Sequence, residues 1–175
     1  MAEGEMLLPD RELYAACAAL VSEASAAGLT VGTAESCTGG LVTGAITSVP
    51  GSSRVVRGSV VSYAIPVKHE VLGVTDDVID GVGVVSAECA AQMAEGARRV
   101  LGCDVSVSVT GIAGPGGEEP GKPVGTVWMG LATPGGTKTF CALFAGDRAA
   151  VRHAAVRRAV DLLREGIMES CDPHR

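Results

Sequence analysis

The first apolar pattern in the chain has the period of a helix. Residues 10–27 place Leu13 and Leu20 on one face at helical spacing. Asp10 precedes this pattern and is a residue type that accepts hydrogen bonds from the first turn of a helix. Gly28 follows it and is typical of a helix end. We predict a helix between these two residues.

The rest of the chain divides into short apolar runs and longer amphipathic segments. β-Branched or alternating runs predict strands at 29–34, 54–63, 104–110, 124–132 and 138–144. Helical spacing and capping residues predict helices at 40–49, within 64–74, and at 75–80, 86–101 and 147–169.

The order of these elements predicts the fold class. Helices lie between the early strands, which favours parallel pairing there. The sequence TPGGT at 133–137 predicts a hairpin between the last two strands. We expect a single domain over 1–175, with its core at about 10–168. The expected fold is α/β, a three-layer α/β/α sandwich with a mixed, mostly parallel sheet.

Charge and hydropathy exclude two classes of partner. The net charge is −6 and there is no long basic run, so we expect no binding to nucleic acid. No segment has the roughly 20 consecutive apolar residues that span a bilayer, so we expect no membrane partner. Residues 1–14 are acidic and lack the apolar stretch of a signal peptide. We expect a cytoplasmic protein.

Cysteine and histidine spacing gives no metal site. The six cysteines form no C-x-x-C pair, and the three histidines lie far apart. Several cysteines fall within helical or strand patterns, where a free thiol packs as a small apolar residue. We therefore expect mainly buried free thiols and no structural metal. The residues concerned are Cys17, Cys37, Cys89, Cys103, Cys141 and Cys171, and His69, His153 and His174.

The sequence ESCTGG at 35–40 is the first candidate for chemistry. It joins a predicted strand to a predicted helix, and such a turn presents free backbone N–H groups. Ser36 is a candidate nucleophile there, with the amides around Thr38, Gly39 and Gly40 as an oxyanion hole. In the alternative interpretation, Ser36 or Thr38 only caps the helix.

Cys37 is a second candidate nucleophile in the same turn. A thiol near a helix start can have a lowered pKa. We rank it below Ser36 because no Cys/His pair is evident in the sequence.

The Gly-rich loop that begins at Thr110 is the second candidate. Its glycines allow close approach to a phosphate, although it matches neither the dinucleotide nor the P-loop pattern. A plain connecting loop is the alternative. Substrate-binding candidates in this loop are Thr110, Gly111, Gly114, Gly116 and Gly117.

A nucleophilic serine needs a base, and Tyr63 and Lys68 follow the second predicted strand. Parallel pairing would bring this strand end beside Ser36. A desolvated lysine can lose its proton near neutral pH. The alternatives are a solvated lysine and a partly buried tyrosine. Arg148 follows Asp147 at the start of the last helix, and its guanidinium can donate two hydrogen bonds to a phosphate or carboxylate. The alternative is a surface arginine.

Taken together and in order, these motifs resemble one family. The chain contains AESCTGG, then SY with a downstream lysine before LGV, then TGIAGPGG, KPVGTV and a final F-x-GDR. This combination resembles the CinA C-terminal domain family, the nicotinamide-nucleotide amidases or NMN deamidases. The resemblance covers about residues 10–168.

The resemblance implies a three-layer α/β/α fold and hydrolysis of nicotinamide mononucleotide to nicotinic acid mononucleotide and ammonia. It implies no metal and no cofactor, and a homo-oligomer. By motif, Ser36 is the catalytic serine and Lys68 its partner. Tyr63 and Thr110 are further active-site residues, and we expect Tyr63 to be catalytic by relaying or orienting protons. Arg148 is the arginine after the last strand, with Arg152 as the second choice.

Two other functions are consistent with the same motifs. The stretch AIPV at 64–67 is apolar where members of the family often have polar residues, which motivates a nucleotide-binding module without catalysis. A phosphoryl-handling enzyme would use the same glycine loops. The sequence has no clear acidic metal cluster, which counts against that class.

Overall fold

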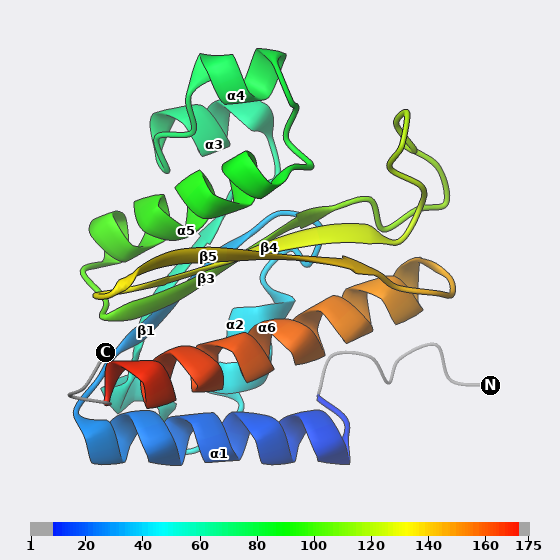
Figure 1. Ribbon diagram of the computed structural model, residues 1–175. Helices are drawn as coiled ribbons and strands as arrows, with labels where there is room; N and C mark the ends of the chain where they lie inside the picture. The colour runs from blue at the N-terminus through cyan, green and yellow to red at the C-terminus, as the bar shows by residue number, and fades with distance from the viewer. Residues whose placement is uncertain (1–8, 172–175) are drawn as a thin grey trace.

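A computed structural model describes residues 9–171 and contains one five-stranded sheet with helices on both faces (Figure 1). The strand order is β2-β1-β3-β4-β5. The strands are β1 (Val31–Glu35), β2 (Val56–Val61), β3 (Val105–Gly111), β4 (Thr126–Thr133) and β5 (Gly136–Leu143). The helices are α1 (Arg11–Ala27), α2 (Leu41–Thr47), the 3-10 turn η1 (Ser52–Arg54), α3 (Ile65–Glu70), α4 (Asp76–Asp80), α5 (Ala87–Leu101) and α6 (Arg148–Ser170).

The sheet is mixed, but the prediction that it is mostly parallel is wrong. β1 pairs in parallel with β2 and β3, whereas β3–β4 and β4–β5 are antiparallel. The antiparallel ladders are the longer ones, with eight paired positions between β4 and β5 against five between β1 and β3. The cause is the connection from β3 to β4. It contains no helix, so the chain cannot cross over and returns antiparallel.

The helices form layers on either side of the sheet, as predicted. In Figure 1, α5 lies on one face with α3 and α4 beyond it, and α2 and α6 lie on the other. α1 packs outside α6 and α2. Arg164 of α6 binds both carboxylate oxygens of Glu23 in α1, at 2.6 and 2.9 Å. This two-pronged contact fixes the register of the outer helix.

Predicted helix ends are confirmed where local capping decides them. Asp10, Ser86 and Asp147 each accept a hydrogen bond from the first turn of α1, α5 and α6. Gly28 and Gly102 end α1 and α5 in the left-handed conformation. These signals lie within four residues of the helix ends, so they are readable without the tertiary fold.

Hydroxyl groups bind α5 to the centre of the sheet. Ser106 and Ser108 on β3 are fully buried and donate to the main-chain carbonyls of Ala94 and Ala90, at 2.6 and 2.5 Å. Gly130 on β4 allows the close approach, because a Cβ there would lie 2.3 Å from the Ala90 oxygen. The serines in the strand sequence DVSVSVT thus replace apolar contacts with hydrogen bonds to a helix backbone.

No helix within residues 9–171 combines the length and the hydropathy that a bilayer crossing requires. Two sequence-based expectations concern residues outside this range. Most of the acidic segment that we expect not to be a signal peptide lies in residues 1–8, and His174 lies in residues 172–175.

Substitution of Ser108 by alanine tests the contact between α5 and the sheet. The Ser108 hydroxyl also accepts from the Gly130 N–H at 3.0 Å, so its loss leaves two buried main-chain groups without this partner. We expect Ser108→Ala to lower the free energy of unfolding by about 1–3 kcal/mol in urea denaturation. The matched control is Ser53→Ala at an exposed position, with an expected change within about 0.5 kcal/mol. Equal effects of the two substitutions would contradict this interpretation.

Candidate active site

Ser36 lies where the inner strand β1 ends. Its main-chain N–H donates to the Val109 carbonyl of β3 at 2.9 Å, so the sheet fixes the start of the turn. The residue is half-buried. β1 lies between two parallel neighbours, and Ser36 therefore sits at the carboxyl edge of the parallel part of the sheet.

Lys68 reaches Ser36 from α3. It is the one buried residue of that short helix, with 1% of its surface exposed. Its Nζ donates to the Ser36 Oγ at 3.0 Å and also to the main-chain carbonyl of Ser62. The structure thus brings together two residues that the sequence separates by 32 positions. A hydroxyl and an amine at this distance can exchange a proton directly.

The surroundings of Lys68 favour its neutral form. Burial lowers the pKa of Lys68 below its ordinary value of 10.5, because the charged ammonium loses its hydration. Nearby thiolates of Cys89 and Cys37 would oppose this effect. Burial, however, raises the pKa of each of these thiols to about 11, so both are neutral at pH 7. Among residues 9–171, no carboxylate forms an ion pair with Lys68.

The amides of the turn are not all available to a substrate. The Gly39 N–H donates to the Ser36 carbonyl at 3.1 Å. The Gly40 N–H donates to the Glu35 carboxylate at 2.9 Å. Both glycines have positive φ angles, 64° and 97°, which shape the turn. The two glycines thus shape the turn, and their N–H groups are already hydrogen-bonded within the protein and are not free to bind an oxyanion.

Two other amides of the same turn have no oxygen acceptor within the described part of the chain. They are the N–H groups of Cys37 and Thr38, directly after Ser36. The Thr38 Oγ1 is also buried without a hydrogen-bond partner there. Adjacent main-chain donors beside a hydroxyl group are the elements of an oxyanion hole.

Glu35 is a residue of the candidate site whose part in shaping the turn the sequence interpretation missed. The carboxylate is fully buried and accepts from the main-chain N–H groups of Gly40, Val42 and Thr43, at 2.9–3.1 Å, and from the Thr33 hydroxyl at 3.2 Å. It supplies the hydrogen bonds that the N-cap of α2 lacks. The available signal was an acidic residue in an apolar strand directly before a Gly-rich turn.

Arg152 holds the other side of the turn. Its Nε donates to the Cys37 carbonyl at 3.1 Å and its Nη2 to the Thr38 carbonyl at 2.9 Å. The sequence interpretation had this arginine as the second choice for a substrate contact. In the structure the guanidinium binds the main chain that carries the nucleophile.

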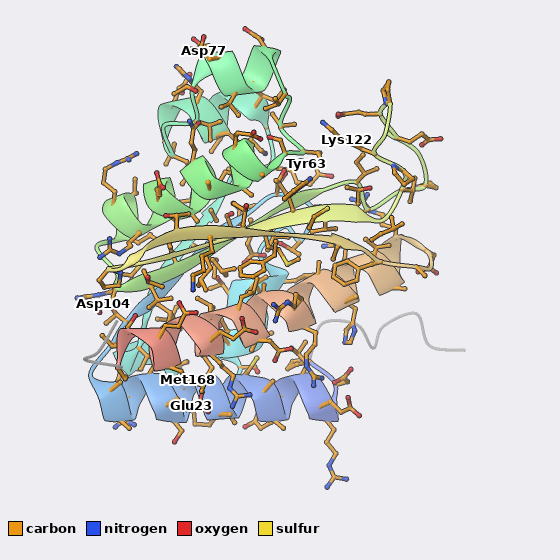
Figure 2. The ribbon with its side chains drawn as sticks, in the orientation of Figure 1. Glu23, Tyr63, Asp77, Asp104, Lys122 and Met168 are labelled. Atoms are coloured by element: carbon orange, nitrogen blue, oxygen red, sulfur yellow. The ribbon has the colours of Figure 1, made fainter. Side chains whose placement is uncertain are left out.

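Tyr63 and Arg148 meet at the rim of the site. Tyr63 is 62% exposed, and its hydroxyl accepts from the Arg148 Nη2 at 3.2 Å. The Arg148 Nη1 donates to the Gly114 carbonyl at 2.8 Å, so the predicted glycine loop reaches the same place. Figure 2 shows Tyr63 at the end of the sheet that also carries Lys122 of this loop. The Tyr63 hydroxyl makes no hydrogen bond to Ser36 or Lys68.

Thr110 and Gly111 have structural tasks in the loop. The Thr110 hydroxyl is buried and donates to the Val84 carbonyl at 2.7 Å. A Cβ at Gly111 would lie 2.6 Å from the Thr126 carbonyl oxygen, so only glycine fits beside β4. Neither residue makes a hydrogen bond to Ser36 or Lys68.

Gly116 and Gly117 lie farther along the loop and are exposed. Their N–H groups have no acceptor among residues 9–171. No described contact joins them to Ser36. They remain candidates for binding a phosphate at the rim.

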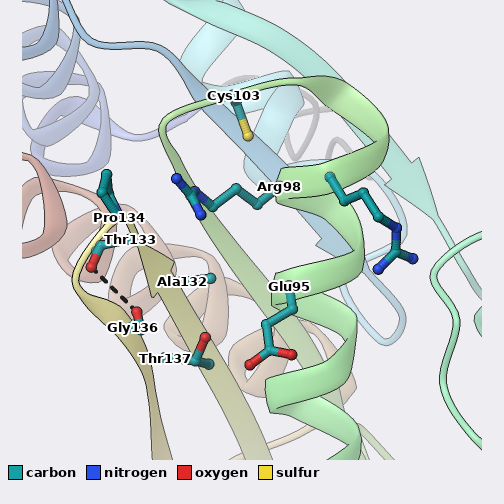
Figure 3. Close-up of a pocket in the computed structure, with 9 residues that line it drawn as sticks. Glu95, Arg98, Cys103, Ala132, Thr133, Pro134, Gly136 and Thr137 are labelled. Carbon is teal, nitrogen blue, oxygen red and sulfur yellow. Dashed lines mark hydrogen bonds between the residues drawn. The ribbon is translucent and has the colours of Figure 1, made fainter.

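A hollow of about 510 Å³ lies elsewhere, between one end of α5 and the β4–β5 hairpin, and Figure 3 shows Glu95, Arg98 and Thr137 around it. This is the end of the sheet at which β3 begins, opposite to Ser36. In residues 9–171, no group of three or more His, Cys, Asp or Glu side chains is placed to hold a metal ion.

Comparison with known proteins gives a consistent match. Residues 14–167 match the family model of the CinA C-terminal domain. A CinA-like protein of Gemmatimonas aurantiaca is 44% identical over 147 residues, which are 84% of this chain and 34% of that protein. A CinA-like protein of Anaeromyxobacter dehalogenans is 44% identical over 93% of this chain and 38% of its own length. The chain thus spans about a third of the curated relatives that it matches.

Solved structures match over nearly their full length. The competence/damage inducible protein of Agrobacterium tumefaciens superposes with a TM-score of 0.87 and 36% identity, over 90% of this chain and 96% of that chain. The competence-damaged protein (CinA) superfamily protein of Escherichia coli gives 0.84 and 34%, over 87% and 89%.

The buried position of Cys37 predicts how the thiols react. With its pKa raised to about 11, Cys37 should be inert to a thiol reagent at pH 8, as should the buried Cys17, Cys89 and Cys103. Only the exposed Cys141 and Cys171 should react in the native protein, and all six in denaturant. The measurement is a thiol titration followed by peptide mass spectrometry. Rapid labelling of Cys37 in the folded protein would restore it as a candidate nucleophile.

Proposed function

This chain belongs to the CinA C-terminal domain family, and on that premise we propose that it is a serine amidohydrolase. Its proposed substrate is nicotinamide mononucleotide, which it converts to nicotinic acid mononucleotide and ammonia. The proposal combines the chemistry implied by the family resemblance with the geometry of one pair of residues. That pair is Ser36 and Lys68.

The observation that carries the proposal is the 3.0 Å contact between the Ser36 Oγ and the Nζ of a lysine that is 1% exposed. A lysine placed only for solubility would extend into water. A buried lysine with a pKa lowered by desolvation is instead suited to act as a general base, because its neutral form is favoured. This base requires neither a histidine nor a metal.

In the first half of the proposed reaction, neutral Lys68 takes the proton of the Ser36 hydroxyl. The Ser36 oxygen attacks the carboxamide carbon, and the carbonyl oxygen becomes an oxyanion that accepts from the Cys37 and Thr38 amides. The C–N bond then breaks. Lys68 returns its proton to the leaving nitrogen, so that ammonia departs and an acyl ester on Ser36 remains.

In the second half, water attacks the ester carbon while Lys68 takes a proton from the water. The bond from the carbon to the Ser36 oxygen breaks, and the proton on Lys68 restores the Ser36 hydroxyl. The product is a carboxylic acid, which ionises at neutral pH. Lys68 is neutral at the start and at the end, so each cycle leaves the base unchanged.

Rim residues provide for the remainder of the substrate. The exposed guanidinium of Arg148 has donors beyond those bound to Gly114 and Tyr63, and suits a phosphate. The N–H groups of Gly116 and Gly117 offer further donors on the same loop. In this proposal Tyr63 orients Arg148 and lines the entrance. Assembly into a homo-oligomer remains an expectation from the family resemblance.

A binding module without catalysis is the principal alternative. It was motivated by the apolar AIPV stretch at 64–67. This stretch still forms the start of α3, with Pro66 in its first turn, and the helix carries Lys68 inward. The apolar substitution therefore leaves the nucleophile and base in contact, which favours the enzyme.

Replacement of the nucleophile tests the proposed activity. We expect the wild-type protein to release ammonia from nicotinamide mononucleotide and Ser36→Ala to lose at least about 10³-fold of this rate, since removal of a nucleophile leaves only binding and oxyanion contributions. Cys171→Ser at an exposed position is the control and should retain full activity. Wild-type protein that binds the nucleotide in calorimetry without releasing ammonia would favour the binding module. Full turnover by Ser36→Ala would reject the serine mechanism.

The pH dependence tests Lys68 as the base. The neutral form is active and burial lowers its pKa, so kcat/KM should rise with pH through a midpoint below 10.5. Lys68→Arg should abolish the rate at all pH values, because arginine stays charged. The measurement is a pH profile of ammonia release between pH 5 and about 10, within the range where the protein stays folded. A profile flat over this range, or activity in Lys68→Arg, would contradict the assignment.

A further inference from the structure

We propose that Glu35 and Arg152 are positioning residues that together build the oxyanion hole. They hold opposite sides of the turn at 36–40 and thereby set the peptide group between Cys37 and Thr38, whose Thr38 N–H is the proposed donor to the reacting carbonyl. The inference rests on the proposed function, and it assigns tasks to two charged side chains that make no hydrogen bond to Ser36 or Lys68.

Glu35 binds the donor side of the chain. Its carboxylate accepts hydrogen bonds from the N–H groups of Gly40, Val42 and Thr43. These N–H groups at the start of α2 would otherwise lack an acceptor within the helix. An anion from a substrate therefore finds no free donor at this helix end. The contacts also tie the end of β1 to the start of α2 and leave the intervening residues no freedom to extend.

Arg152 binds the acceptor side. It holds the carbonyls of Cys37 and Thr38, the residues that directly follow Ser36. In a trans peptide the C=O and the following N–H point in opposite directions. A guanidinium that holds the Cys37 carbonyl therefore turns the Thr38 N–H away from Arg152. The charged donor also polarises this peptide and strengthens its N–H as a donor.

The two side chains come from independent parts of the fold. Glu35 belongs to β1 at the centre of the sheet, and Arg152 to the second turn of α6, 115 residues from Cys37. The two do not form an ion pair with each other in the described structure. Each instead forms hydrogen bonds with main-chain groups of the turn and of the start of α2, because buried peptide groups need partners.

This arrangement predicts a defect in the transition state. The oxyanion exists only after Ser36 has attacked, so a displaced Thr38 N–H should lower kcat and leave KM nearly unchanged. Loss of one oxyanion donor costs about 10²–10³-fold in kcat in a serine hydrolase. A residue that binds the substrate itself would instead raise KM.

The test compares Arg152→Lys and Glu35→Gln with the wild type on two substrates. These are nicotinamide mononucleotide and its thioamide analogue, in which sulfur replaces the carbonyl oxygen. A sulfur anion is larger and a weaker hydrogen-bond acceptor, so an intact hole should favour the oxygen substrate. We expect each variant to lose about 10–100-fold in kcat with oxygen, and the oxygen-to-sulfur rate ratio to fall by about 10-fold.

Arg157→Lys is the matched control, because Arg157 lies on α6 near Arg152, pairs with Glu12 and Asp161, and makes no hydrogen bond to the turn at 36–40. It should keep both the rate and the ratio. Thermal unfolding checks that each variant folds, and either of the two variants is sufficient for the test. A lower kcat with an unchanged rate ratio, or an increase in KM alone, would overturn the inference. Absence of turnover in the wild type would instead reject the proposed function.

Discussion

The contact between a buried amine and a hydroxyl is the constraint on which the site depends. A lysine loses hydration when it is buried, so burial favours the neutral amine and requires hydrogen-bond partners. Lys68 has such partners, since its Nζ donates to Ser36 and to the Ser62 carbonyl, and no carboxylate pairs with it in residues 9–171. The burial that makes Lys68 costly to place in the interior also lowers its pKa, which favours the neutral amine that a base requires.

The topology explains how this pair is held. β1 has parallel neighbours on both sides, so the turn after it is fixed by β3 through the Val109 carbonyl and by β2 through Ser62. The antiparallel hairpin then reverses the chain and delivers α6 to the same edge. Arg148 and Arg152 thus reach the site from one helix, one at the rim and one beneath the turn.

The sequence predicts what is encoded locally. Capping by Asp10 and Ser86 and the TPGGT hairpin depend on residues a few positions apart, and all three are observed. The family motifs led to Ser36 and Lys68, which the structure places in contact. The direction of β4 relative to β3, and the use of Glu35 and Arg152, were not readable. The direction of β4 depends on the path of the loop after β3, which has no helical periodicity. The use of Glu35 and Arg152 depends on main-chain N–H and carbonyl groups, which no side-chain pattern in the sequence indicates.

The two sides of α3 differ in how freely their residues can be substituted. Along α3 the exposed side carries Ile65, which is 46% exposed, whereas Lys68 on the inner side is 1% exposed. Substitutions on the outer side of a helix leave its inner contacts in place when the capping residues and the buried position are kept. The apolar residues at 64–67 therefore change the outer surface of α3 and leave the contact between Ser36 and Lys68 in place. In the proposed enzyme, the exposed side of α3 can thus vary without moving Lys68 away from Ser36.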